Sequence, residues 1–324
     1  MLTEGLAVPE CNRIARWIAE SCKAVLKRRG VVVGVSGGVD SAAALLLAVQ
    51  ALGPERVIAL ILPDKDSDPL SERLAREATT AAGVETLRMD ISTILEASGC
   101  YALRDQAITS IVPDFEPLAD KAKIVLPNNL LADAGLNIFS VVVVRPDGTE
   151  VRRRLTAERG RAIVAASNMK QRTRMLALYY HAEARHYAVL GTANKNEVDL
   201  GFFVKYGDGG VDIQPLAHLF KTEVYAVART LNVPADIIRR VPTTDTYSAP
   251  GSQEEFFYRL SFEILDPVWC AHESGQPTDE IATAHHLTQT QVTHIIDDIS
   301  SKQRSAAYLK REPLFLARKD ILTA

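Results

Sequence analysis

One short segment of the chain has the residue types that hold a phosphate group. Residues 34–41 read GVSGGVDS and stand between the apolar runs VVV and AAALLLA. A glycine-rich turn between a strand and a helix lets backbone N–H groups converge on an anion at the helix N-terminus, where the helix dipole favours negative charge. The pattern is neither G-x-x-x-x-G-K-[ST], because no lysine follows the last glycine, nor G-x-G-x-x-G, because the glycines stand at 34, 37 and 38.

The same segment contains a carboxylate, Asp40, which a purely structural glycine turn would not need. A negative charge beside bound polyphosphate repels it unless a cation lies between them. We therefore assign Asp40 to Mg²⁺, a hard cation that prefers carboxylate and phosphate oxygens. The hydroxyls of Ser36 and Ser41 can donate hydrogen bonds to the phosphates.

The elements that must position this segment alternate between strands and helices. The runs at 31–35, 56–63 and 84–92 are mostly apolar and predict buried parallel strands. Helical patterns at 11–28, 40–53 and 67–83 accompany them, and the last two end at Gly53 and Gly83. A helix at 166–185 and a strand at 187–193 continue the order, which predicts an α/β fold with a doubly wound parallel sheet.

Two parts of the chain depart from this alternation. The run NIFSVVVVRPDGTEVRRRL at 137–155 predicts a β-hairpin within an insertion at about 100–160. A helical segment at about 252–324 closes the chain, and TDEIATAHHLTQTQVTHIIDDI at 278–299 has the two-helix pattern of a helix-turn-helix. The segment is acidic, whereas a DNA-reading helix carries Lys or Arg for the phosphates, so we expect a packing unit and no nucleic-acid partner. We expect a single domain over 1–324.

Composition sets limits on the class of protein. The 324 residues are 47% hydrophobic and 24% charged, and the formal net charge is −3, which points to neither nucleic acid nor an acidic membrane surface. No signal-peptide pattern and no stretch of ~18 uncharged apolar residues is present. The cysteines form no C-x-x-C pair, which is typical of reduced thiols in the cytoplasm: Cys11, Cys22, Cys100 and Cys270.

Several motifs resemble those of a known family. The run Ser36-Gly37-Gly38-Val39-Asp40-Ser41 matches the S-G-G-x-D-S PP-loop of ATP pyrophosphatases, which cut ATP between the α- and β-phosphates. The block VLGTANKNEVDLGFFVKYGDGGVDIQPLAHLFK at 189–221 resembles the NAD synthetase family. Its upstream NMKQRTRM helix at 168–175 and the segment RRVPTTDTY at 239–247 fit the same family in the right order. The resemblance implies the PP-loop, or adenine nucleotide alpha-hydrolase, type of fold.

The resemblance also implies a role for individual residues, with Asp40 and Lys221 as the catalytic pair. Asp40 and Glu197 would share Mg²⁺, and Lys221 would stabilise the charge that develops at the phosphates. The ATP-binding positions would be Gly34, Val35, Ser36, Gly37, Gly38, Val39, Asp40, Ser41, Thr192, Lys221 and Thr243. The positions for the dinucleotide substrate would be Arg172, Lys205, Asp212 and, in place of the family's terminal His-Lys pair, Lys302.

The implied reaction is the ATP-dependent amidation of deamido-NAD by ammonia, giving NAD, AMP and pyrophosphate. The phosphate loop begins at residue 34, which leaves no room before it for the glutaminase domain of glutamine-dependent members, so we expect free ammonia or a separate glutaminase. Family members are homodimers, and we expect a homodimer here. GTANKNE replaces the more usual G-T-D-H-x-x-E, so two alternatives stay open: an amide ligase for a different carboxylate, and a non-catalytic nucleotide-binding protein.

Overall fold

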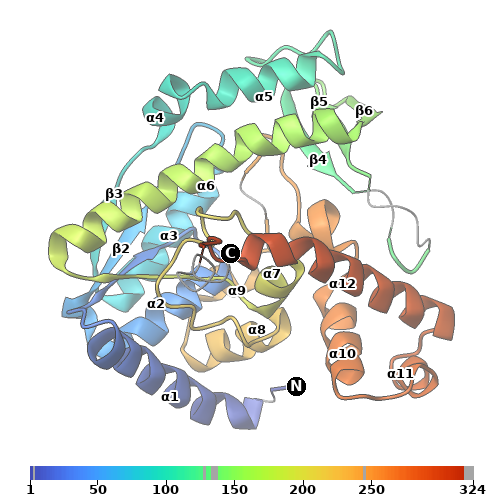
Figure 1. Ribbon diagram of the computed structural model, residues 1–324. Helices are drawn as coiled ribbons and strands as arrows, with labels where there is room; N and C mark the ends of the chain where they lie inside the picture. Colours follow the sequence, from blue (N-terminus) through green and yellow to red (C-terminus); the bar gives the residue numbers. More distant parts are fainter. Residues whose placement is uncertain (3, 127–128, 133–137, 244–245, 317–324) are drawn as a thin grey trace.

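The computed structural model is built on a parallel β-sheet of four strands. It describes residues 1–2, 4–126, 129–132, 138–243 and 246–316. The strand order is β3-β2-β1-β7, and every neighbouring pair is parallel (Figure 1). The strands are β1 (Val31–Gly34), β2 (Val57–Ile61), β3 (Glu85–Arg88) and β7 (Ala188–Leu190).

Helices cover both faces of this sheet. Val31 and Val33 pack into one hydrophobic core and Val32 into another, because alternate strand residues face opposite sides. The first core is completed mainly by α1 (Glu4–Glu20), α2 (Val39–Leu52), α3 (Pro69–Ala82), α8 (Lys221–Thr230) and α9 (Ala235–Arg239). The second is completed by α4 (Ser92–Ala97), α5 (Cys100–Thr109) and α6 (Ala157–Arg185). The predicted α/β fold with a doubly wound parallel sheet is confirmed.

The insertion forms a second, antiparallel sheet at one end of α6 (Figure 1). The predicted hairpin is confirmed, since β5 (Ser140–Val144) pairs with β6 (Glu150–Arg154). A third strand, β4 (Lys121–Val125), pairs with the other side of β5. Sequence reasoning missed β4, whose residues KAKIV lie outside the hairpin pattern at 137–155. The sheet packs on α6 through a hydrophobic cluster that includes Val141 and Ile163.

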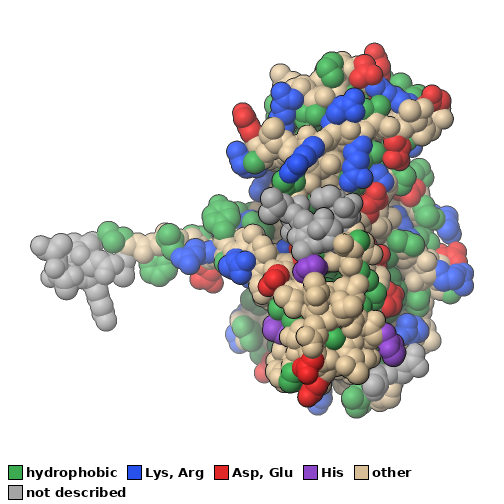
Figure 2. All heavy atoms as spheres, turned by 90° about the vertical axis from the view of Figure 1, so that its right-hand side faces the viewer, with side chains coloured by type: hydrophobic (Ala, Val, Ile, Leu, Met, Phe, Trp, Pro, Cys, Tyr) green, Lys and Arg blue, Asp and Glu red, His purple; other side chains and the backbone are tan. Residues whose placement is uncertain are grey.

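The C-terminal part is helical, as expected, over its described residues. Three helices, α10 (Phe262–Glu273), α11 (Thr278–Ala284) and α12 (Gln289–Lys310), pack around the buried Trp269. The helix-turn-helix pattern corresponds to α11 and the first half of the 22-residue α12. After α12, the chain extends away from the rest of the molecule (Figure 2), and Leu314, Phe315 and Leu316 are 82%, 85% and 75% exposed. No described helix is long and apolar enough to cross a membrane.

The strand order places a ligand site at the end of β1. The chain runs outward from β1 to β2 and β3, and then returns to the other side of β1 as β7. In doubly wound sheets, ligands bind at such a reversal, outside the carboxyl ends of the strands, because the loops there diverge. The loop after β1 contains the segment predicted to bind phosphate, and the loop after β7 leads into α7 (Lys195–Leu200).

Candidate active site

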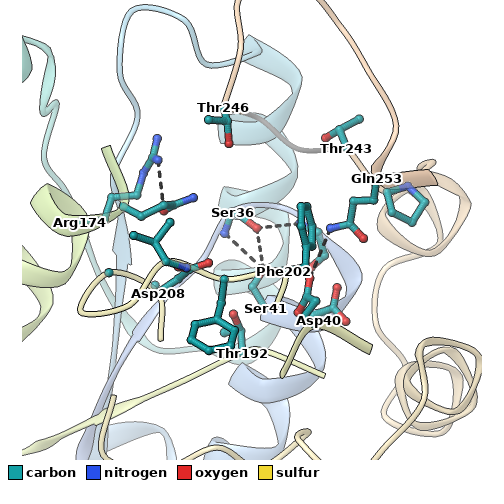
Figure 3. A pocket seen from close by; sticks show the side chains of 18 of the residues that line it. Ser36, Asp40, Ser41, Arg174, Thr192, Phe202, Asp208, Thr243, Thr246 and Gln253 are labelled. Atoms are coloured by element: carbon teal, nitrogen blue, oxygen red, sulfur yellow. Dashed lines mark hydrogen bonds between the residues drawn. The ribbon is translucent and has the colours of Figure 1, made fainter. Parts of the chain in front are cut away.

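A cavity of about 540 Å³ opens at this point of the sheet. Such a volume is typical of small-molecule sites in proteins. Its wall comes from the loop after β1, the ends of β2 and β7, one side of α6, α7 and the segment around Thr243 (Figure 3). The predicted residues that line it are Gly34, Val35, Ser36, Gly38, Val39, Asp40, Ser41, Thr192, Glu197, Lys221 and Thr243. The ATP-side prediction therefore converges on one cavity, with Gly37 in the same loop but outside the lining.

The loop after β1 is a tight turn closed by its serines. Ser36 N–H donates to the Ser41 hydroxyl at 3.2 Å, and that hydroxyl donates to Gly38 O at 2.9 Å. Gly37 has φ +78°, and a Cβ there would lie 2.4 Å from Ser71 O, so only glycine fits. Gly38 caps α2, and no described side chain caps this helix end. The first N–H groups of a 14-residue helix are thus left for an anion.

Asp40 is held at the start of α2 by two partners. Its Oδ2 forms an ion pair with the buried Lys221 ammonium, and its Oδ1 accepts a hydrogen bond from Asn194 Nδ2 at 2.9 Å. Lys221 is the first residue of α8, so this ion pair joins the loop after β1 to a helix that lies 181 residues further along the chain. Burial alone would lower the pKa of Lys221, but the Asp40 and Glu197 carboxylates hold it above its usual value.

Glu197 is the second carboxylate, and α7 fixes its position. Asn194 and Glu197 form a capping box: the Asn194 side chain accepts from Glu197 N–H, and Glu197 Oε2 accepts from Asn194 N–H at 3.1 Å. Gln253 Nε2 donates to Glu197 Oε1 at 3.4 Å. Desolvation in the cavity wall and the nearby Asp40 charge raise the pKa of Glu197 to about 8.

The charges of this cluster fit a divalent cation. Two carboxylates lie beside a single ammonium, and burial of Glu197 next to the Asp40 charge raises its pKa, a cost that a further cation would offset. No group of three or more metal-binding side chains occurs among the described residues. A cation here would take Asp40 and Glu197 from the protein and further oxygens from phosphate and water, as Mg²⁺ does in nucleotide sites.

The four predicted dinucleotide contacts lie outside the cavity lining, and two of them, Lys205 and Lys302, involve α12. Lys205 donates to Tyr308 O at 3.2 Å and to Arg311 O at 2.6 Å, at the end of α12. Lys302, on α12, is buried and donates to Phe257 O at 2.7 Å. Both ammonium groups therefore bind protein groups in this structure.

The other two predicted contacts lie on and beside α6. Asp212 accepts from Val189 N–H at 2.8 Å and from the Tyr179 hydroxyl at 3.0 Å, so it fixes the loop next to β7. Arg172 is on the exposed side of α6. Two residues further along α6, Arg174 lies in the cavity lining instead.

Sequence reasoning missed several polar residues of the cavity. Arg174 donates to Leu62 O at 3.1 Å and to Asp64 Oδ2 at 2.8 Å, and Figure 3 shows it across the cavity from Asp40. Arg240 also lines the cavity, and so do Asp208 and Gln253. Arg174 and Asp208 stand inside the matched motifs NMKQRTRM and GFFVKYGDGG, so the signal was present. Arg172 and Arg174 belong to the same motif, and only the orientation of α6 shows that Arg174 and not Arg172 lines the cavity.

The chain matches one family profile and two relatives that share a name. The profile of the family described as NAD synthase matches residues 10–114 and 101–308. The NH(3)-dependent NAD(+) synthetase of Rhizobium meliloti is 44% identical over 304 residues, which are 94% of this chain and 90% of that protein. The protein of the same name from Thermotoga maritima is 39% identical over 248 residues, 76% of this chain and 82% of that protein.

Solved structures share the fold. The NH3-dependent NAD synthetase of Campylobacter jejuni superposes with a TM-score of 0.62 at 22% identity, over 96% of this chain and 99% of that one. The NAD+ synthetase of Burkholderia pseudomallei gives a TM-score of 0.57 at 24% identity, over 93% and 90%. These similarities confirm the predicted PP-loop type of fold. With most of its length matched by the family profile and by close relatives, the chain belongs to the NAD synthase family.

Proposed function

We propose that this chain makes NAD by the ATP-dependent amidation of deamido-NAD with ammonia. The family to which the chain belongs, and the relatives named NH(3)-dependent NAD(+) synthetase, support this activity. The observation that carries the proposal is the meeting of Asp40, Glu197 and Lys221 in one cavity beside an uncapped helix N-terminus. A protein that only binds a nucleotide would not need both carboxylates beside the phosphates.

In the first step, the nicotinate carboxylate attacks the α-phosphorus of ATP and pyrophosphate leaves. The N–H groups at the start of α2 hold the phosphate chain, and the Ser36 hydroxyl adds a donor. The Ser41 hydroxyl donates to Gly38 O and keeps the turn closed. Lys221 supplies positive charge where the oxygens of the pentavalent phosphorus become more negative. Mg²⁺ held by Asp40 and Glu197 would supply charge neutralisation to the departing pyrophosphate.

In the second step, ammonia attacks the acyl carbon of the adenylate, AMP leaves with the bridging oxygen, and the nitrogen releases one proton to solvent to give the amide. This step needs no covalent bond to the enzyme, so the contribution of the protein is positioning and exclusion of water. The cavity wall includes Phe202, Phe203 and Phe256, whose rings reduce the access of water to the reactive adenylate.

We further propose a homodimer in which the dinucleotide lies across the mouth of the cavity. The cavity suits one nucleotide in size, and the four residues predicted for the dinucleotide lie outside it. On α6, Arg172, Leu176 and Tyr180 are exposed and spaced four residues apart, which places them on one stripe of the helix. Leu176 is 63% and Tyr180 67% exposed, so a second chain would bury apolar surface next to Arg172.

We also propose that residues 1–324 form one catalytic unit, because residues from Gly34 to Leu309 line the same cavity. Ammonia reaches this cavity either free from solution or from a separate glutaminase protein. Among the free cysteines, Cys11, Cys22 and Cys100 are buried thiols, which supports a reducing compartment such as the cytoplasm.

A pyrophosphate-release assay with ATP, Mg²⁺ and ammonium, with and without deamido-NAD, tests the activity. We expect release that depends on deamido-NAD and that matches the NAD formed. Release with another carboxylate but not with deamido-NAD would show an amide ligase of different specificity. No release with any carboxylate would favour a nucleotide-binding protein without catalysis.

A further inference from the structure

A buried carboxylate outside the cavity connects the two helices that present the reactive groups. Asp266, on α10, has no exposed surface and accepts three hydrogen bonds. Thr222 N–H and the Thr222 hydroxyl both donate to its Oδ2 at 2.9 Å, and Asn196 Nδ2 donates to its Oδ1 at 2.6 Å. Asp266 does not line the cavity, so any effect that it has on the reaction passes through its neighbours.

The amide of Asn196 can have only one orientation. Its Nδ2 faces the Asp266 carboxylate, and its Oδ1 accepts from Lys221 N–H at 2.9 Å. An ionised carboxylate only accepts and a backbone N–H only donates, so a flipped amide would lose both bonds. Asp266 therefore fixes Asn196, and Asn196 holds the backbone of Lys221.

Each partner of Asp266 is next in sequence to a residue of the charged cluster. Asn196 precedes Glu197 on α7, and Thr222 follows Lys221 at the start of α8. Asn194, the residue that caps the N-terminus of α7, donates from its side-chain amide to Asp40 Oδ1. A carboxylate near the N-terminus of α8 also interacts favourably with the helix dipole. One buried anion thus joins α7, α8 and α10 behind the cavity.

We propose that Asp266 is a positioning residue: through Asn196 and Thr222 it sets the spacing of Glu197 and Lys221, and with it the geometry in which Mg²⁺ and the phosphates are held. The proposal rests on the proposed function for the identity of the reaction. The positioning role can be tested without knowing the carboxylate substrate, because it concerns how tightly Mg²⁺ and nucleotide bind and how fast the α-phosphorus reacts.

The first test is Asp266→Asn, which keeps the size of the side chain. An asparagine has one acceptor oxygen, so its NH₂ must face either the Thr222 donors or Asn196 Nδ2. We expect kcat to fall by about 10- to 100-fold, the range for loss of a partner that orients a metal ligand, with a higher Mg²⁺ concentration for half-saturation. A folded Asp266→Asn with wild-type kcat and Mg²⁺ dependence would overturn the proposal.

A reciprocal exchange tests the hydrogen-bond chain itself. In Asp266→Asn with Asn196→Asp, the new amide at 266 donates to the new carboxylate at 196, which still accepts from Lys221 N–H. The amide oxygen at 266 still accepts from Thr222, so every bond is kept with one polarity reversed. We expect the double variant to recover most of the kcat lost in Asp266→Asn. A double variant no better than the worse single variant would contradict the proposal.

Controls separate positioning from stability and from the identity of the substrate. Asp120→Asn removes another buried carboxylate, paired with Arg145 in the insertion, and should lower the melting temperature without changing kcat or Mg²⁺ dependence.

If Asp266→Asn does not fold, Thr222→Val removes one hydrogen bond and should lower kcat by about fivefold, and an unchanged kcat would count against the proposal. Mg²⁺-dependent binding of a fluorescent ATP analogue needs no acceptor, so it decides on Asp266 even if deamido-NAD proves not to be the substrate.

Discussion

At the scale of single residues, the site is defined by an excess of negative charge. Asp40 and Glu197 have one ammonium group, Lys221, between them, and Asn194 gives Asp40 its second partner. The pKa of Glu197 rises to about 8 because its charge is desolvated and close to Asp40. A divalent cation removes this cost, so the binding of metal, the loss of a proton and the binding of ATP should be linked.

The first residue-scale prediction concerns Asp40→Asn. The substitution keeps the shape of the side chain and removes one of two proposed metal ligands. We expect kcat to fall by more than about 100-fold, the upper end of the loss seen for outer-shell partners of metal sites. The fold should persist, with a circular dichroism spectrum like that of the wild type. Full activity in a folded Asp40→Asn would show that the metal assignment is wrong.

The second residue-scale prediction concerns the pH dependence of Mg²⁺ binding. Below a pH of about 8, Glu197 is protonated in the metal-free protein, and the metal must displace that proton. Mg²⁺ affinity in the presence of a non-hydrolysable ATP analogue should therefore rise on the order of tenfold between pH 7.0 and 8.5. Calorimetric titration measures it. Glu197→Gln is the control: it should bind more weakly and lose this rise, and an identical rise in both proteins would contradict the account.

At the scale of elements, the phosphate site depends on how closely the loop after β1 approaches α3. Gly37 has no room for a side chain, because a Cβ would lie 2.4 Å from Ser71 O and 3.0 Å from Ala75 N on α3. The loop can therefore keep its N–H groups directed at an anion only while residue 37 is glycine. The helix that follows then presents its uncapped end to the cavity.

Gly37→Ala tests this element. The positive φ alone costs about 1–3 kcal/mol for a side chain, and the contact with Ser71 O adds to it. We expect lower stability and a higher KM for ATP. Gly83→Ala is the matched control, since Gly83 has φ +65° but no atom within 4 Å of the added Cβ. Gly83→Ala should lose stability with an unchanged KM, and an equal KM in all three proteins would contradict the role of the loop.

The elements also show how far the sequence could lead. The order of strands and helices, the hairpin and the turn between β1 and α2 follow from local patterns, and these predictions are confirmed. Phosphate binding by that turn stays a prediction. Whether Arg172 or Arg174 faces the cavity depends on the orientation of α6 about its own axis against the sheet. The motif around the two arginines does not give that orientation. The partners of Lys205 lie about a hundred positions away in the chain, so only the tertiary structure brings them together. Lys302 has one partner on its own helix, Asp298, and one that is 45 positions away, Phe257.

At the scale of the whole molecule, two of the exposed apolar surfaces bear on the proposed homodimer. One is the stripe of α6 with Leu176 and Tyr180, and the other is the extended segment with Leu314, Phe315 and Leu316. Exposed apolar surface of this kind is typical of protein interfaces. The proposed homodimer would cover it and place Arg172 next to a second chain.

Leu176→Asp tests the α6 surface. Because Leu176 is 63% exposed, the substitution should change the stability of one chain little, while a charge inside a dimer interface weakens association. Sedimentation velocity should show a dimer for the wild type and a shift toward monomer for Leu176→Asp. Leu118→Asp, at a fully exposed position of the insertion, should remain dimeric. A wild-type monomer, or a Leu176→Asp dimer of unchanged affinity, would contradict the proposed interface.

If the amide forms through an acyl adenylate, one oxygen of the nicotinate carboxylate passes to AMP, and isotope labelling can follow it. Deamido-NAD labelled with ¹⁸O in the nicotinate carboxylate is converted with ATP, Mg²⁺ and ammonium, and the products are analysed by mass spectrometry. We expect one ¹⁸O in each AMP, one left in the amide of NAD, and none in pyrophosphate. Unlabelled AMP, or ¹⁸O in inorganic phosphate together with ADP, would contradict it.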